Sequence, residues 1–347
     1  MNSRERVLAS INHKIPDRIP VHTISIDNPK PFLEHLGLEN YEALLKYLNI
    51  DVRSVSPISK NPLINDCIIS PFGTSGGFSD YSANTFKRPF DKAETIKEIE
   101  NYIWPDVEEW DFNGFRIMME KYESPYAIMA SSWNPIFDQI LDLFGMENAL
   151  VNMCINPELI EAAVAYVEDY YLKYYSKLFD ALSGKVQIFN MGDDFATQRG
   201  MLLSPEIWRR MFKPTYKKIF EIAKAHNLYV WFHSCGAISE VLPDLIDIGM
   251  DVWETVQAHL PGNEPERIKR EYGKDIAFFG AINTQTTMPF GTPNDVRQEV
   301  RERVYILGKD GGYICGPDHH IKEDVPIENF LALYDEIINF REVGYTL

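Results

Sequence analysis

Short runs of β-branched and aromatic residues recur along the chain, separated by segments in which apolar residues recur at helical spacing. Runs of this length, bounded by Gly, Pro, Asn or Asp, are typical of buried strands. Eight runs predict strands, at residues 18–23, 51–56, 126–132, 186–194, 228–235, 252–257, 276–283 and 311–317.

Helix start signals stand between the later runs. Ser204 and Pro205 precede the segment "IWRRMF", and Thr292 and Pro293 precede "VRQEVRERVYIL". A hydroxyl side chain at the N-cap with Pro at the first helical position is a common start of a helix. Strands that alternate with helices predict an α/β fold, a parallel (β/α)8 TIM barrel, with a doubly wound open sheet as the alternative.

The domain organisation follows from what interrupts this pattern. No Gly/Ser linker, low-complexity tract or fixed-period repeat divides the sequence, so residues 1–347 are expected to form a single domain. The stretch 57–125 is rich in Gly, Pro and aromatic residues. We interpret it as an N-terminal insertion between early strands.

Composition and charge narrow the function classes. The formal net charge of -17 argues against a nucleic-acid partner and against an anionic membrane surface. No apolar window reaches the length of about 18 residues that a membrane span needs, and the N-terminal residues are polar. A cytoplasmic location is therefore expected. Four cysteines are too few for a disulfide scaffold in this chain, so they are expected to be thiols and free to bind a metal.

The barrel prediction indicates where chemistry is expected, because active sites of such barrels lie at the C-terminal ends of the strands. Polar and metal-binding side chains gather at the ends of the expected strands. They are His22, Asp193, Asp194, His233, Cys235, Gln257, Asn283, Cys315 and His319.

His233 and Cys235 are the strongest metal candidates. Side chains at i and i+2 along a strand project to the same face, so the two are placed to share an ion. The alternative is a packed Cys beside a hydrogen-bonded His. A further ligand is expected from "ICGPDHH", where either Cys315 or His319 completes the site. A His with one or two thiolates favours zinc.

Carboxylate and amide side chains near these ligands are candidates for catalysis. Asp193 and Asp194 are adjacent, so strand pleating sends them to opposite faces, and one of them is expected to point into the barrel mouth. A capping or turn role is the alternative. Glu254 and Gln257 are three residues apart, and by the same parity only one of them is expected to face inward. We count Asp193, Asp194 and Gln257 as catalytic candidates.

Four further residues are candidates for contact with a substrate. His22 ends the first expected strand, and Asn283 ends another. Trp133 and Phe195 are aromatic residues near strand ends that could line a pocket for a planar molecule. For His22 a structural role, and for the aromatic residues a place in the core, are the alternatives.

Several blocks resemble one known superfamily. These are "SRERVLASINHKIPDRIPV", "GDDFATQRGMLLSPEIWRRMFKPTYKKIF", "FHSCGAISEVLPDLIDIGMDVWETVQ", "FGAINTQTTMPFGTPNDVRQEV" and "GGYICGPDHHIKEDVPIENF". Together they resemble the uroporphyrinogen decarboxylase-like superfamily over nearly the whole chain. The resemblance implies a (β/α)8 barrel, and it implies either a decarboxylase or a corrinoid-linked methyltransferase.

The methyltransferase branch looks closer. The arginine-rich motif of the decarboxylases is expected after the first strand, but no arginine occurs between Arg18 and Arg53. The methyltransferases bind zinc through an H-x-C pair, matched by His233 and Cys235, and a later cysteine. By the downstream motif that cysteine falls at or near His319, whereas Cys315 lies four residues earlier.

The resemblance therefore implies a zinc-dependent methyltransferase that moves a methyl group between a small molecule and a corrinoid. The small molecule would be a methyl ether or other methylated compound, a thiol or a folate. No D-x-H-x-x-G corrinoid motif is present, so a partner protein is expected to carry the cobalamin. The alternatives are a decarboxylase and a barrel that binds a small ligand without turning it over. The assembly state stays open, with a homodimer as one alternative.

Overall fold

The structure is a computed structural model and describes residues 1–60, 71–74 and 87–340. Its strands are β1 (Val52–Val55), β2 (Ala127–Ser131), β3 (Ile188–Gly192), β4 (Ala196–Thr197), β5 (Gly200–Met201), β6 (Tyr229–His233), β7 (Val252–Val256), β8 (Ala277–Ile282) and β9 (Tyr313–Pro317). Its longer helices are α1 (Ser3–Ile11), α5 (Phe112–Lys121), α6 (Phe137–Phe144), α7 (Met146–Ile155), α8 (Pro157–Asp180), α10 (Lys213–Ala225), α12 (Pro265–Tyr272), α14 (Pro293–Leu307) and α15 (Ile327–Asn339). Shorter ones are α2 (Lys30–Leu36), α3 (Tyr41–Tyr47), α4 (Ile96–Glu100), α9 (Pro205–Met211), α11 (Leu242–Asp247), α13 (Thr287–Phe290) and the 3-10 turn η1 (Val107–Glu109).

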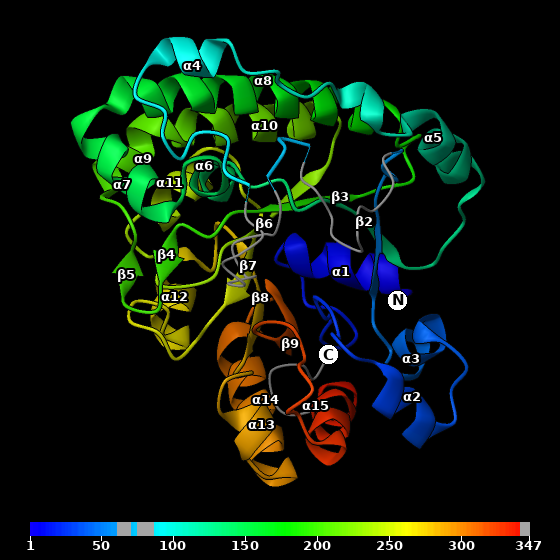
Figure 1. The fold of residues 1–347 in the computed structure, drawn as a ribbon. Coiled ribbons are helices and arrows are strands. Elements are labelled where there is room, and N and C mark those ends of the chain that lie inside the picture. The colour runs from blue at the N-terminus through cyan, green and yellow to red at the C-terminus, as the bar shows by residue number, and fades with distance from the viewer. Residues whose placement is uncertain (61–70, 75–86, 341–347) are drawn as a thin grey trace.

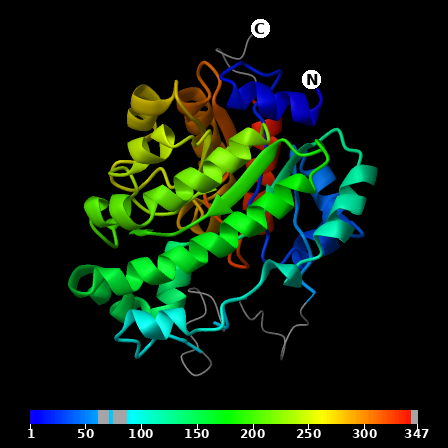
Figure 2. The same ribbon diagram turned by 90° about the horizontal axis from the view of Figure 1, so that it is seen from above.

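The main sheet contains seven strands in the order β1-β2-β3-β6-β7-β8-β9, and each neighbouring pair is parallel. Most helices pack around the outside of this curled sheet, with α8 and α10 side by side and α14 beside α15, whereas α1 packs against the residues inside the curl (Figures 1 and 2). The hairpin β4–β5 is antiparallel and follows β3. The α/β prediction is confirmed, with seven of the eight expected strands forming the sheet.

The eighth expected strand, at 18–23, is reduced to a bridge at Val21. Its backbone still links the two edges of the sheet: the Asp51 N–H donates to Val21 O (2.8 Å), and the His22 N–H donates to Cys315 O (3.1 Å). Pro20 accepts a hydrogen bond from the Cys315 N–H (2.9 Å) but has no N–H to donate. Regular pairing of this segment is therefore lost, and the sheet is curled without eight complete strands.

Strand pleating divides the apolar side chains into two layers. Inside the curl lie residues such as Met129, Trp231 and Phe279, with Val7 and Ile11 of α1 packed against them. Residues of the opposite parity face the surrounding helices and form the larger core, for example Ile128, Val230 and Phe278. This parity decides which side chains at the strand ends look into the mouth of the curl.

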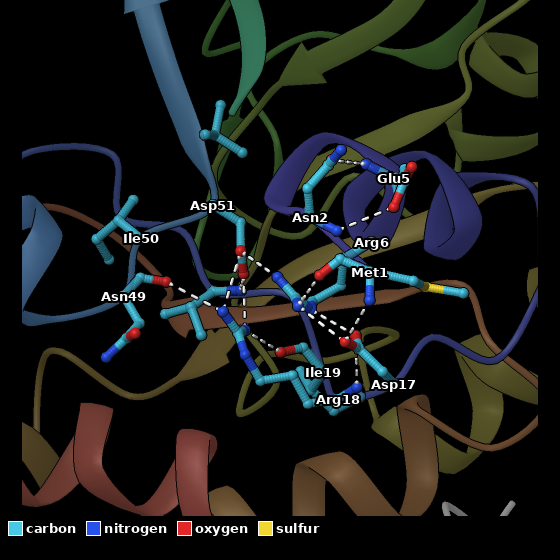
Figure 3. Close-up of polar contacts among 12 residues, drawn as sticks. Met1, Asn2, Glu5, Arg6, Asp17, Arg18, Ile19, Asn49, Ile50 and Asp51 are labelled. Carbon is cyan, nitrogen blue, oxygen red and sulfur yellow. Dashed lines mark hydrogen bonds and ion pairs between the residues drawn. The ribbon is translucent and has the colours of Figure 1, made fainter. Parts of the chain in front are cut away.

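The N-terminal end of the sheet is filled by charged residues (Figure 3). The fully buried Asp51, just before β1, accepts hydrogen bonds from Arg6 (2.8 Å) and from Arg18 (2.7 Å). Asp17 pairs with the same Arg6 at 2.7 Å. Buried charges persist where they are paired and hydrogen-bonded. These ion pairs close the N-terminal end of the sheet, so an active site is expected at the C-terminal ends of the strands.

Other expectations can be compared with the elements. Ser204 caps α9, accepting from the Ile207 N–H at 3.3 Å, and Thr292 forms a capping box at the start of α14. Both helix starts are thus confirmed. Residues 57–125 lie between β1 and β2 and, where described, add no strand to the seven-stranded sheet. Across the described residues, no single helix is long and apolar enough to cross a membrane; only the bent pair α7–α8, meeting at 117°, passes that test.

Candidate metal centre

Three side chains that can bind a metal meet at the C-terminal end of the sheet. His233 ends β6, Cys235 stands two residues later, and His319 follows the end of β9. One ligand atom from each lies within 4.8 Å of the others. Ligands on one tetrahedral zinc ion, at bond lengths of about 2.0–2.3 Å, are about 3.3–3.6 Å apart. The three residues therefore fit a common ion after small side-chain shifts.

Glu254 fixes the orientation of His233. One carboxylate oxygen of Glu254 lies 2.7 Å from His233 Nδ1, and the other accepts a hydrogen bond from the indole N–H of Trp231. Burial by itself would lower the pKa of His233, but the hydrogen bond and charge of Glu254 outweigh it and raise the pKa. A carboxylate on Nδ1 leaves Nε2 for a metal, the arrangement common at zinc sites.

Asp194 places a second carboxylate beside the same ligands. Its Oδ1 accepts a hydrogen bond from the Cys235 N–H (2.9 Å) and lies 3.9 Å from His233 Nε2. Burial raises the pKa of the Cys235 thiol, and the charge of Asp194 raises it further. A thiolate at this position therefore needs a nearby cation.

His319 supplies the third donor as a neutral imidazole. Burial, with smaller contributions from His233 and His320, lowers its pKa to about 4. Its ring centroid lies 5.9 Å from that of His233 and 4.7 Å from that of His320, whose Nδ1 pairs with Asp27 at 3.0 Å. An imidazole must be neutral to bind a metal, so the low pKa suits this role.

A pocket of about 500 Å³ opens beside the three donors. Cys235 and His319 form part of its wall, and the β4–β5 hairpin forms another part. The remaining lining residues come from the loops after β6, β7, β8 and β9: Gly236, Gln257, Thr284, Gln285, His320, Lys322 and Asp324. Two threonines and three glutamines, Thr197, Gln198, Gln257, Thr284 and Gln285, give this wall hydroxyl and amide groups. A small polar molecule can thus reach the metal candidates.

Comparisons with known proteins show the family of this chain. The model of the uroporphyrinogen decarboxylase (URO-D) family matches residues 123–340, a region that includes all three metal candidates. The chain belongs to the URO-D family. Among curated proteins, this family member is similar to the methylated-thiol--coenzyme M methyltransferase of Methanosarcina mazei, with 27% identity over 191 residues. That match covers 54% of this chain and 47% of the relative, so the chain spans about half the length of the curated protein it matches.

Among solved structures, the URO-D family chain is similar to a methyltransferase from Methanosarcina mazei. The TM-score is 0.71 at 16% sequence identity, and the match covers 99% of this chain and 100% of that one. At this identity the likeness shows the fold. Family membership agrees with the resemblance seen in the sequence blocks, as does the methyltransferase name of both relatives.

Pleat parity explains why Cys315 is absent from the group of metal candidates. Cys315 lies on β9 with its side chain in the outer core layer, next to the inward-facing Ile314. It is fully buried, and its Sγ accepts a hydrogen bond from the Tyr313 hydroxyl at 3.3 Å. The structure thus brings His319, and not Cys315, to His233 and Cys235. The fourth cysteine, Cys67, lies outside the described residues.

The adjacent aspartates point in opposite directions, as parity predicts. The fully buried Asp193 accepts from the N–H groups of Ile136, Phe137 and Asp138 at 2.7, 2.6 and 3.0 Å, and from the Tyr216 hydroxyl at 2.5 Å. It therefore caps α6, which is the alternative to its catalytic role. Asp194 is the one that faces the candidate metal centre.

Glu254 and Gln257 both reach the site, which corrects the expectation that only one would. Gln257 accepts a hydrogen bond from the Gly236 N–H (2.7 Å) and lines the pocket, while Glu254 holds His233. The pairing of β7 with β8 shifts register between Trp253 and Val256. An irregularity of this kind changes the parity of the residues that follow it.

The four substrate candidates are spread over different environments. Trp133 is 53% exposed, and its ring packs edge-on against His233 at 5.4 Å. Phe195 is fully buried against Trp208, which places it in the core and not at the rim. His22 is buried between Trp231 and Phe279, so the structural alternative describes it.

Asn283 has a local structural role. The Asn283 Oδ1 accepts from the N–H groups of Gln285 and Thr286 at 2.8 and 2.9 Å, which stabilises the turn after β8.

The β4–β5 hairpin, whose Gln198 bonds Gln285 at 2.9 Å across the pocket, was not expected. Two-residue strands give no detectable periodicity, so the only sequence signal for this hairpin is its polar tip, which contains a glycine.

Proposed function

We propose that this protein is a zinc-dependent methyltransferase that moves a methyl group between a small molecule and a corrinoid held by a partner protein. The observation that carries the proposal is the meeting of His233, Cys235 and His319 beside a pocket of about 500 Å³. The methyltransferase names of the two relatives support the same reaction class. The methyl group would come from, or go to, a methyl ether or other methylated compound, a thiol or a folate.

The donor chemistry favours zinc over the other common ions. Two imidazole nitrogens and one thiolate form a borderline-soft set that is unsuited to Mg²⁺ or Ca²⁺. Zinc, when bound, would act as a Lewis acid on a substrate heteroatom and make the methyl group, or a thiol that accepts it, more reactive. Glu254 would keep Nε2 of His233 directed at the ion through its 2.7 Å contact with Nδ1.

The pocket wall supports a small polar substrate. Gln257 is held by the Gly236 N–H through Oε1, so its amide N–H₂ group can donate to a ligand. Lys322 and Asp324 give the lining one charge of each sign. The wall therefore carries no surplus of positive charge for a substrate with many carboxylates. This also argues against the decarboxylase alternative.

The corrinoid partner and the wider organisation belong to the same proposal. The sequence has no D-x-H-x-x-G motif for cobalamin, so the cobalamin would approach the pocket on another protein. We further propose that residues 1–347 act as one domain, and that residues 20–22 stand in for the first strand of a (β/α)8 barrel.

Elemental analysis of the purified chain tests the metal. We expect about one zinc per chain. Cys235→Ser should lose the metal, and Cys154→Ser, at an exposed cysteine on α7, should keep it. Incubation with a Co(I) corrinoid and a panel of methyl donors then tests the reaction, because methylation of cobalt changes its visible absorbance. Zinc-free wild-type protein after mild purification would refute the proposal, as would release of CO₂ from a substrate without any change at cobalt.

A further inference from the structure

The carboxylate of Asp194 lies closer to the metal candidates than a bystander needs to. Asp194 follows β3 with inward parity, and its Oδ1 bonds the Cys235 N–H at 2.9 Å. The same oxygen is 3.9 Å from His233 Nε2, the nitrogen that Glu254 leaves open. Asp194 thus touches two of the three donor residues at once.

We propose that Asp194 is a fourth ligand of the centre, which completes a closed set in the resting enzyme and gives way when a substrate binds. This inference rests on the proposed function, because it concerns the same metal. It goes further by assigning an oxygen ligand and by stating how access to the ion is controlled.

The spacing supports direct binding. Neighbouring ligands on a tetrahedral zinc ion are about 3.3–3.6 Å apart. The Oδ1–Nε2 separation of 3.9 Å is a few tenths of an ångström longer, and the three donors themselves are separated by up to 4.8 Å. Asp194 stands outside the group whose ligand atoms all lie within 4.8 Å of one another, so its carboxylate must turn further than the three donors to join an ion that they hold.

The charges lead to the same assignment. Two neutral imidazoles and one thiolate leave a divalent ion with one unbalanced positive charge, and a carboxylate removes it. Conversely, Asp194 beside a Cys235 thiolate is a repulsive pair unless a cation lies between them. A zinc ion bound by all four groups satisfies both conditions, with a net charge of zero.

Two of the neighbouring carboxylates, Asp193 and Glu254, are already fully used. Asp193 is saturated by three backbone N–H groups and a tyrosine hydroxyl. The two oxygens of Glu254 are taken by His233 and Trp231. Asp194 is also only partly buried, with a side chain that is 22% exposed. It can therefore swing aside without opening the core.

A closed resting set changes how ligands enter. An incoming heteroatom must replace the carboxylate, so the apparent affinity for an added ligand is reduced by the fraction of time that Asp194 occupies the fourth position. Removal of Asp194 should weaken metal binding and at the same time strengthen ligand binding to the loaded centre. A carboxylate that only positions Cys235 would not produce these opposite changes.

The test compares Asp194→Asn, Asp194→Ala and the matched control Asp180→Asn, an exposed carboxylate at the end of α8 that does not line the pocket. Asparagine keeps an oxygen that accepts from the Cys235 N–H but is a poor metal ligand. Zinc affinity is measured by competition with a chromogenic chelator. The cobalt(II)-loaded proteins are titrated with 2-mercaptoethanol, followed by the visible spectrum. Thermal melting of the metal-free proteins checks that each variant folds.

We expect both Asp194 variants to lose zinc affinity by about 10–100-fold and to bind 2-mercaptoethanol more tightly than wild type does. Asp180→Asn should change neither quantity. Zinc affinity at the wild-type level in Asp194→Asn would overturn the inference and leave a positioning role, as would thiol binding that fails to tighten. If wild-type protein binds neither zinc nor cobalt, the proposed function fails. If wild-type protein binds zinc and the Asp194 variants behave like it, only the inference fails.

Discussion

Replacement of Glu254 by Gln tests whether Glu254 orients His233, and it leaves the three candidate metal ligands in place. The Glu254 side chain is buried and accepts from two donors, His233 Nδ1 (2.7 Å) and the Trp231 indole. A glutamine offers one oxygen and one N–H₂ group, so one of these donors must face another donor. A buried donor left unpaired costs about 1–3 kcal/mol.

Two quantities should change in Glu254→Gln. The free energy of unfolding of the metal-free protein should fall by about 2 kcal/mol, measured by urea denaturation. Zinc affinity should fall by about 10–100-fold, because the carboxylate no longer holds the imidazole with Nε2 toward the ion. Glu240→Gln, an exposed carboxylate in the loop after β6, serves as the control and should change neither quantity by more than about 0.5 kcal/mol.

The pH dependence adds an independent check on the same variant. Glu254 raises the pKa of His233 against the effect of burial. In wild type, protons therefore compete with the metal more strongly as the pH falls through this raised pKa. Without the carboxylate, burial dominates and the pKa falls, so the loss of zinc affinity should be larger near pH 8 than near pH 6. A loss of less than about twofold at both values, or a larger loss at the lower pH, would refute the role given to Glu254.

Three further substitutions test particular contacts. His22→Phe should reduce the loss of stability between about pH 6.5 and 4 by up to about 3 kcal/mol. Burial lowers the pKa of His22 to about 4, so on acidification the unfolded chain takes up the proton first. Free energies of unfolding in urea that fall equally with pH in variant and wild type would exclude this. Gly192→Ala places a methyl group 2.4 Å from the Trp133 ring and 2.8 Å from His233 Cβ, so tryptophan fluorescence should shift and zinc affinity should fall; an unchanged spectrum with full affinity would contradict the packing. Cys315→Ala should keep the zinc content of wild type while losing about 1–2 kcal/mol of stability, and loss of zinc would restore Cys315 as a ligand.

Much of the fold can be predicted from local signals in the sequence. The runs at 228–235 and 276–283 are apolar, β-branched and aromatic, and they contain β6 and β8. The Ser204 and Thr292 caps also mark their helices, because a side-chain oxygen and the helix amides it bonds are neighbours in sequence. The expected strand at 18–23 failed to form regular pairs, since Pro20 withholds a donor where the segment meets β9.

The candidate site was less predictable because it depends on positions where regular strand geometry stops. Within strands, parity was a sound guide: it explains why Cys315 faces the helices. Directly after β3 the alternation still separated Asp193 from Asp194. It failed at Gln257, which follows a register shift in β7 that no residue pattern announces.

His319 belongs to the same class of position, two residues past the end of β9, where the chain has left the sheet and its direction depends on contacts with other loops. The loops after β6 and β9 meet because the sheet curls, although β7 and β8 lie between the two strands. This is a long-range property of the fold, which local residue patterns do not give. A rule that joins both observations follows. Donors on a strand can be assigned by parity, whereas donors beyond its end must be assigned by the partners they find. By that rule Asp194, which lies past the end of β3 and bonds the amide of Cys235 at 2.9 Å, is assigned to the centre by its contact and not by its parity alone.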